Sequence, residues 1–197
     1  MYLDKDICKE GNLVLRTKCI EVNIPLNSND ESCLIELYQY LIISENEELA
    51  KRYNIRPGVG IAAPQVGVNK RMFAMNCVDF LDEKLTKYTY CVINPKIIAH
   101  SNEMTYLPDG EGCLSITRDT LGYVVPRYYS IKFKAALYDL TTKKIKYITK
   151  TLEGYPAIVF QHEYDHLDGI LYVDKMVLPE KTTAIPLYTI KNDEENN

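Results

Sequence analysis

The chain has 197 residues, of which 46% are hydrophobic and 25% are charged, and its formal net charge is -4. These values are typical of one globular domain, and the negative balance argues against a general affinity for nucleic acids and against specific DNA binding. No apolar stretch approaches the length of a membrane-spanning helix, and the N-terminus lacks the pattern of a leader peptide. Six cysteines without any Cys-x-x-Cys pair favour free thiols and a cytoplasmic location.

The first predicted element is a helix that is capped within residues 28–30 and continues to Arg52. Its apolar residues follow helical spacing. Strands are then predicted, the third being the clearest because Ile131, Phe133, Ala135 and Leu137 alternate with Lys132, Lys134 and Ala136. Residues 139–143 are expected to form a hairpin turn. The predicted strands cover residues 71–76, 90–98, 129–138 and 144–152.

A late helix is predicted from Tyr155 to the residue before Gly169. It carries His162 and His166, which at a spacing of four residues lie one turn apart on the same face, with Glu163 between them in the sequence. Two imidazoles in this arrangement can bind one metal ion, and the pattern is typical of hydrolytic metal sites. Histidines with this spacing also occur as ordinary core or surface residues.

The predicted elements indicate an α+β fold, in which mainly antiparallel sheets pack around a central metal-binding helix, with a further helix near the N-terminus. We expect residues 1–190 to form a single catalytic domain. The polar residues 191–197 are expected to be a disordered tail.

A catalytic site of this type needs a third protein ligand, and Cys113 is the best candidate. Gly110 and Gly112 allow the backbone to turn tightly beside it, and a thiolate is a strong ligand for iron, zinc or cobalt. The alternative is a buried free cysteine, which is our expectation for the remaining five, Cys8, Cys19, Cys33, Cys77 and Cys91.

A glycine-rich segment at residues 58–67 precedes both motifs. It lacks the Gly-x-Gly-x-x-Gly spacing of a dinucleotide loop, and a tight turn under a helix would explain it. Beside a metal site, however, small residues would let a substrate backbone approach closely. The amide of Gln65 could then donate to an oxygen that gains negative charge.

Taken together, the three motifs resemble those of the peptide deformylases. The family patterns Gly-φ-Gly-φ-Ala-Ala-x-Gln, Glu-Gly-Cys-φ-Ser and Gln-His-Glu-x-Asp-His-Leu-x-Gly stand here at residues 58–65, 111–115 and 161–169, without a mismatch. The resemblance extends over most of the chain. The long segment between the first two motifs is similar to the longer, type 2 class of bacterial deformylases, whereas residues 179–197 fall outside the resemblance.

The resemblance implies a metal-dependent hydrolase that removes the N-formyl group from the N-terminal formylmethionine of newly made polypeptides and releases formate. In this scheme Glu163 moves the proton of the attacking water, while the Gln65 amide and the backbone N–H of Leu114 meet the developing oxyanion. By the same resemblance, Glu111 is expected to pair with Arg127 and to hold the cysteine-bearing loop.

Substrate binding is expected to depend on shape. An extended peptide could add alongside residues 59–61 by main-chain hydrogen bonds, and the selection of formyl over acetyl would fall near Gly112 and Cys113. The first side chain needs an apolar pocket. The residues expected to contact substrate are Val59, Gly60, Ile61, Gly112, Tyr123 and Val159, with His162 as a further wall of the pocket.

The ligand set suits zinc, whereas the resemblance implies one ferrous ion per chain in the cell, and purified protein could carry zinc, nickel or cobalt. The expected partners are N-formylmethionyl nascent peptides and the ribosome, and the enzyme is expected to be a monomer.

Two rival interpretations remain. A zinc endopeptidase with the same helix would need a downstream ligand, but no histidine follows His166. A non-catalytic binding module would be expected to have lost a ligand, Glu163 or Gln65, yet all are present.

Overall fold

The computed structural model describes residues 1–189, and the predicted tail at 191–197 lies outside these residues. Within the described part, no helix is long and apolar enough to cross a membrane. The α-helices of this part are α1 (Ser28–Ser44), α2 (Glu47–Tyr53) and α3 (Gly154–Leu167). Its strands are β1 (Gly60–Ala62), β2 (Met72–Val78), β3 (Lys87–His100), β4 (Met104–Tyr106), β5 (Arg127–Tyr128), β6 (Ser130–Asp139), β7 (Lys144–Glu153) and β8 (Ile185–Pro186).

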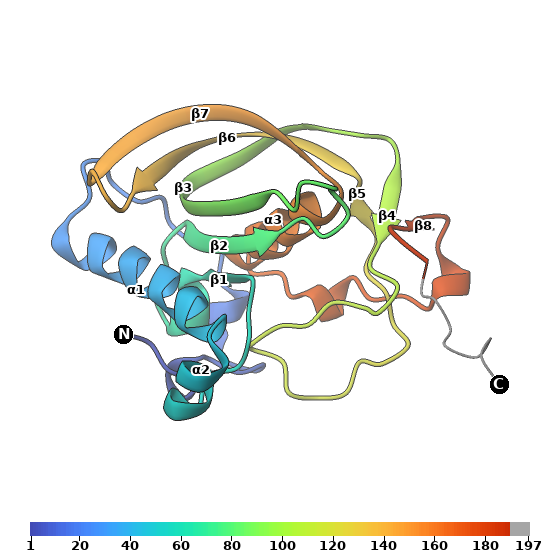
Figure 1. Ribbon diagram of the computed structural model, residues 1–197, viewed down its shortest axis with the longest axis horizontal. Coiled ribbons are helices and arrows are strands. Elements are labelled where there is room, and N and C mark those ends of the chain that lie inside the picture. The colour runs from blue at the N-terminus through green and yellow to red at the C-terminus, as the bar shows by residue number, and fades with distance from the viewer. Residues whose placement is uncertain (190–197) are drawn as a thin grey trace.

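The strands form two sheets. The larger sheet is antiparallel with the order β1-β2-β3-β6-β7, and the smaller has the order β5-β4-β8, in which β4 and β8 run parallel. Figure 1 shows α1 and α3 on opposite sides of the larger sheet, with the small sheet at one end of the molecule. The predicted α+β fold with mainly antiparallel sheets around the late helix is confirmed.

The larger sheet separates two hydrophobic clusters. Alternate residues of β6 face opposite sides, so that Phe133 belongs to the cluster under α3 and Tyr138 to the cluster under α1. Phe160 of α3 packs edge-on against Phe73, with ring centroids 5.1 Å apart, and lies 4.2 Å from the ring of Phe133. This aromatic packing fixes α3 against the sheet, and the histidines of α3 therefore stand on a rigid support.

The prediction of one helix from residues 28–30 to Arg52 was wrong at both ends. The cap is Asn27, whose side chain accepts hydrogen bonds from the backbone N–H groups of Asn29 and Asp30, both at 2.9 Å. The helix then stops at Ser44. Asn46 caps a separate helix, because its side chain accepts from the N–H of Leu49 at 2.9 Å.

The late helix is confirmed. It begins at Gly154 and ends at Leu167, and Gly169 follows with φ of +73°. A Cβ at residue 169 would lie 2.8 Å from the carbonyl oxygen of Arg16, so this stop requires glycine. Among the five cysteines expected to be buried and free, all are free, but Cys8 is only half-buried.

Candidate active site

One side chain from a loop and two from α3 converge on a single point. Cys113, His162 and His166 each offer a ligand atom, and these three atoms lie within 4.8 Å of one another. The Sγ of Cys113 is 3.3 Å from Nε2 of His166. Metal bonds to such atoms are about 2.0–2.3 Å long. Two ligand atoms on one tetrahedral ion are therefore separated by a distance similar to that between Cys113 Sγ and His166 Nε2. The three residues therefore fit a single metal ion.

The charges in this cluster favour the thiolate. Burial alone would raise the pKa of Cys113, but the neighbouring imidazoles of His166 and His162 outweigh burial and hold that pKa well below its usual value. The pKa of His162 lies well above its usual value, because its contacts with Cys113 and Glu111 outweigh its own burial. Since a thiolate is the form that binds metals, the site is electrostatically prepared for a cation.

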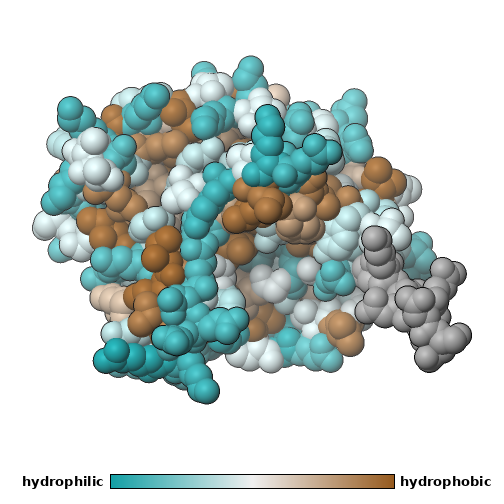
Figure 2. Space-filling view, viewed as in Figure 1, coloured by the Kyte–Doolittle hydropathy of each residue, from teal (hydrophilic) through white to brown (hydrophobic). Residues whose placement is uncertain are grey.

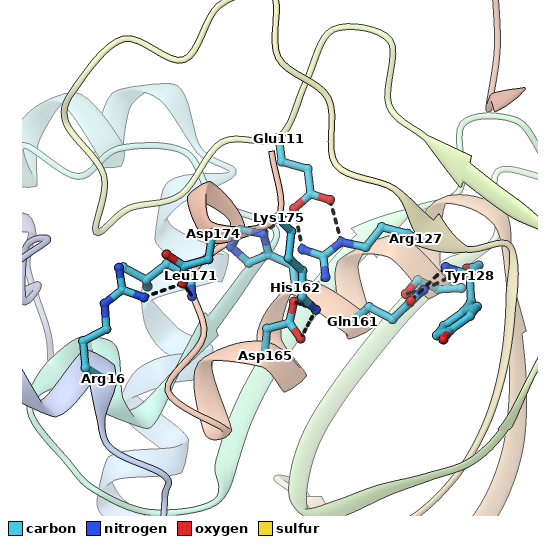
Figure 3. Close-up of polar contacts among 11 residues, drawn as sticks. Arg16, Glu111, Arg127, Tyr128, Gln161, His162, Asp165, Leu171, Asp174 and Lys175 are labelled. Atoms are coloured by element: carbon cyan, nitrogen blue, oxygen red, sulfur yellow. Dashed lines mark hydrogen bonds and ion pairs between the residues drawn. The ribbon is translucent and has the colours of Figure 1, made fainter. Parts of the chain in front are cut away.

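Behind the cluster, Glu111 joins a metal-site histidine to a buried arginine (Figure 3). Its Oε2 lies 2.8 Å from Nδ1 of His162, and its two oxygens accept hydrogen bonds from Nε and Nη2 of Arg127 at 2.8 and 2.9 Å. Both partners are almost fully buried, with exposed fractions of 4% and 2%. The contact fixes the ring orientation of His162 and ties the cysteine-bearing loop to α3.

The same arginine has a second carboxylate partner that our sequence reasoning missed. Arg127 Nη1 donates to Asp165, which also accepts from Lys175 Nζ at 2.7 Å (Figure 3). Asp165 falls inside the third motif, three residues after His162 and hence on the same side of the helix. That spacing was the available signal. It places Asp165 near the helix face that carries His162, and Glu111 of the loop approaches His162 from outside the helix, so that Arg127 can pair with both carboxylates.

Glu163 is buried beside the cluster with 3% of its surface exposed. Among the described residues, its Oε2 has no hydrogen-bond partner. Burial is the main cause that raises the pKa of Glu163 to about 7, although the two histidines oppose the shift. A carboxyl group with such a pKa can both accept and return a proton near neutral pH.

Gln65 is held beside Cys113 by two further contacts. Its Oε1 accepts from the N–H of Ala62 at 2.9 Å, which leaves its Nε2 to face Cys113 Sγ at 3.4 Å and Ser115 Oγ at 3.3 Å. The amide is therefore locked with its donor toward the metal-binding atoms. The supporting contact with Ser115 was not anticipated, although this serine belongs to the second motif.

Leu114 is held by two cations that the sequence did not single out. Its carbonyl oxygen accepts from Lys9 Nζ at 3.2 Å and from Arg56 Nη2. Arg56 in turn donates from Nε to Asp4 at 2.8 Å. These contacts anchor the backbone next to Cys113 to the N-terminal segment.

A cavity of about 700 Å³ opens over the candidate metal site, and its lining includes Cys113, His162, Glu163 and Gln65. Figure 2 shows this face hollowed near its centre, with hydrophobic side chains around the recess. Four of the residues expected to contact substrate line the cavity. They are Val59, Gly60, Gly112 and Val159.

The two other expected residues are not part of the cavity lining. Ile61 is fully buried in the cluster under α1. Tyr123 is 43% exposed, and its carbonyl oxygen lies 2.9 Å from the position that a Cβ at Gly110 would occupy. Tyr123 therefore shapes the neighbouring loop through its backbone. Apolar walls that the sequence reasoning missed come instead from Tyr155 and Ile158 of α3.

A buried carboxylate, whose Oε2 has no hydrogen-bond partner within residues 1–189, beside a Cys/His/His cluster in an open cavity is the arrangement of a metal-dependent hydrolase. The sequence model described as "Polypeptide deformylase" matches residues 4–182, and the chain belongs to this family. It is 45% identical to "Peptide deformylase 2" of Bacillus cereus over 174 residues, which is 88% of this chain and 90% of the relative. It is also 45% identical to the peptide deformylase of Halalkalibacterium halodurans, with 89% and 92% of the two chains covered.

Solved structures agree with this assignment. A probable peptide deformylase from synechococcus phage S-SSM7 superposes with a TM-score of 0.62 at 37% identity, covering 86% of this chain and 97% of the other. The Met-Ala-Ser-bound class I type b enzyme from Acinetobacter baumannii has a TM-score of 0.64 at 30% identity, covering 86% and 96%. The protein is thus an enzyme that removes the N-formyl group from nascent polypeptides, and neither the endopeptidase nor the binding module is favoured.

Proposed function

We propose that Cys113, His162 and His166 bind one divalent metal ion and that the bound formyl group is hydrolysed beside them. The observation that carries this proposal is the convergence of the three ligand atoms next to the buried carboxylate of Glu163, whose Oε2 has no partner in the described part of the chain. When bound, such an ion polarises a carbonyl group and makes a water molecule more acidic.

We further propose Fe(II) as the ion in the cell, as the family resemblance implies. Zinc, nickel or cobalt would replace it in purified protein, because nitrogen and sulfur ligands generally bind those ions more tightly. Elemental analysis of anaerobically isolated protein, together with activity per metal ion, distinguishes the working ion from a substitute.

Glu163 carries the proton in this proposal. Its Oε2, which has no partner among the described residues, accepts a proton from the attacking water and returns it to the nitrogen of the leaving amine. Burial keeps the pKa of this group at about 7, so both transfers are accessible near neutral pH. The products are formate and a free amino terminus.

Neutral donors stabilise the oxygen that gains negative charge. Gln65 Nε2 is directed toward the cluster because its Oε1 is occupied by Ala62, and the backbone N–H of Leu114 lies next to the cysteine in the chain. Both groups are preorganised by other contacts, so no rearrangement is needed during the reaction.

The peptide is proposed to lie along β1. This strand is at the edge of the larger sheet, so within residues 1–189 one side of its backbone has no strand partner, and Val59 and Gly60 line the cavity. Ile61 would then contribute through its backbone alone. The methionine side chain would enter the apolar part of the cavity near Val159, with Gly112 close to the formyl group. The solved structure of the Acinetobacter enzyme holds Met-Ala-Ser, which supports a peptide that begins with methionine as the ligand of this cavity.

We propose that residues 1–190 form one catalytic domain, since the two hydrophobic clusters share the same sheet. The substrate emerges from the ribosome, and we therefore propose that the enzyme acts in the cytoplasm and in contact with the ribosome. We also propose that it is a monomer. Cosedimentation with ribosomes and analytical ultracentrifugation test these points.

The activity is tested by incubating the protein with formyl-Met-Ala-Ser and measuring formate, with acetyl-Met-Ala-Ser as the matched control. Release of formate without loss of the acetyl group supports the proposal. Internal cleavage of a longer peptide would indicate an endopeptidase, and no reaction with metal-loaded protein would indicate a binding module.

A further inference from the structure

We infer that residues 185–188 form a brace that positions the metal-site loop, residues 107–113, and that Tyr188 is the positioning residue at its end. The inference rests on the metal site proposed above. The family match ends at residue 182, so the brace lies beyond the part of the chain that the family model describes.

The brace begins where β8 pairs in parallel with β4, immediately before the metal-site loop (Figure 1). Thr105 Oγ1 donates to the carbonyl oxygen of Ile185 at 2.9 Å, and the N–H of Leu187 donates to the carbonyl oxygen of Tyr106 at 2.9 Å. Because these contacts hold the last residues before the loop, they fix the direction in which the loop leaves the small sheet.

The next contact reaches the loop itself. The hydroxyl of Tyr188 donates to Oδ2 of Asp109 at 2.7 Å. Asp109 is two residues before Glu111, which contacts His162, and four residues before Cys113. The hydroxyl thus restrains the loop at a second point, in addition to the buried contact between Glu111 and Arg127.

The ring of Tyr188 also contacts the other wall of the cavity through one intermediate residue. Its centroid lies 5.4 Å from that of Phe80, which lies 4.8 Å from the ring of Tyr155. Tyr155 belongs to the first turn of α3 and lines the cavity. Tyr188 therefore connects the loop that supplies Cys113 with the helix that supplies both histidines.

This arrangement has a kinetic consequence. A ligand on a loop moves away from the metal more often than ligands on a packed helix, because loops open locally at a lower free-energy cost. Loss of the Tyr188 hydroxyl should therefore increase the rate at which Cys113 releases the ion. Glu111 remains fixed by Arg127, so the increase should be smaller than the roughly 10- to 100-fold effect typical of groups bonded directly to a metal ligand.

The test measures the release of Zn²⁺ from loaded protein to a chromophoric chelator. Tyr188→Phe removes the hydroxyl and keeps the ring, and Asp109→Ala removes its acceptor. Tyr147→Phe is the matched control, because Tyr147 is 71% exposed on β7, a strand that contributes no residue to the cavity lining. The melting temperatures of the metal-free proteins are measured in parallel.

We expect Tyr188→Phe and Asp109→Ala each to accelerate release by about 3- to 10-fold. The double variant should be no faster than either single variant, since both remove the same interaction. Asp109→Asn, which keeps an acceptor oxygen, should restore most of the slow release, and Tyr147→Phe should match the wild type.

Unchanged release from Tyr188→Phe, or effects that multiply in the double variant, would overturn the brace alone. So would a lower melting temperature of the metal-free variant with unchanged release, because that result indicates a purely structural role. If wild-type protein bound no more Zn²⁺ than Cys113→Ala, both the brace and the metal site would be wrong.

Discussion

The carboxylate of Glu163 fills the space that a side chain at residue 60 would need. A Cβ added to Gly60 would lie 2.3 Å from Oε1 of Glu163, well inside van der Waals contact. Gly60 lies on the edge strand β1, and Glu163 lies between the two metal-site histidines on α3. The glycine of the first motif is therefore required by the carboxylate of the third.

Gly60→Ala should displace Glu163 and reduce formate release by about 10²-fold or more, the usual range for a disturbed general base. Metal content should stay normal, because none of the three ligands is touched. Gly58→Ala is the control, since a Cβ there meets Leu114 at an ordinary 3.5 Å. Equal activity of the two variants would contradict the steric argument.

Arg127→Met should affect both metal binding and stability. It leaves Glu111 buried without its arginine and Asp165 with Lys175 as its remaining cation, and breaking such a buried pair typically costs about 3–5 kcal/mol. It also frees His162 from its oriented partner, so metal affinity should fall by roughly 10- to 100-fold.

The comparison for this change is Arg16→Met. Arg16 pairs with Asp174 where the side chains are 40% and 37% exposed, and such pairs contribute about 1 kcal/mol or less. Chemical denaturation and metal titration measure both quantities, and similar losses in the two variants would argue against the buried network.

Gln65→Leu should retain the metal and lower the rate constant by about 10²–10³-fold, the typical loss for one oxyanion donor. Steady-state kinetics with formyl-Met-Ala-Ser should show the loss in kcat and little change in KM. An increase in KM with unchanged kcat would mean that Gln65 stabilises the bound substrate in its ground state and contributes nothing specific to the transition state.

Local patterns were sufficient to predict two of the long elements, β6 and α3. The alternation from Ile131 to Leu137 predicted β6, and the histidine spacing with Gly169 predicted α3. The break between α1 and α2 was missed because Asn46 lies within a continuous helical pattern, where its capping role depends on the backbone conformation. The short strands β4, β5 and β8 have too few residues for a recognisable period, and they form through pairing with distant segments.

The site shows the same division. Its central residues were predictable because their spacing within motifs carries the chemistry. Residues that support them from far along the chain were not, as the contacts of Lys9 and Arg56 with Leu114 demonstrate. The expected pocket walls also differed, because Ile61 points into the core and Tyr155 reaches the cavity from the first turn of α3. A side chain's direction is decided by packing between elements, which a single sequence does not display.

The most direct test of the account is to measure metal stoichiometry and formate release on the same samples of Glu163→Gln, with Cys113→Ala as the contrast. Because Glu163 adjoins the ligands without being one, Glu163→Gln should hold one metal ion per chain and lose about 10²–10⁴-fold of its activity. Cys113→Ala should lose the metal itself. A Glu163→Gln protein that keeps its metal and releases formate at nearly the normal rate would contradict the account.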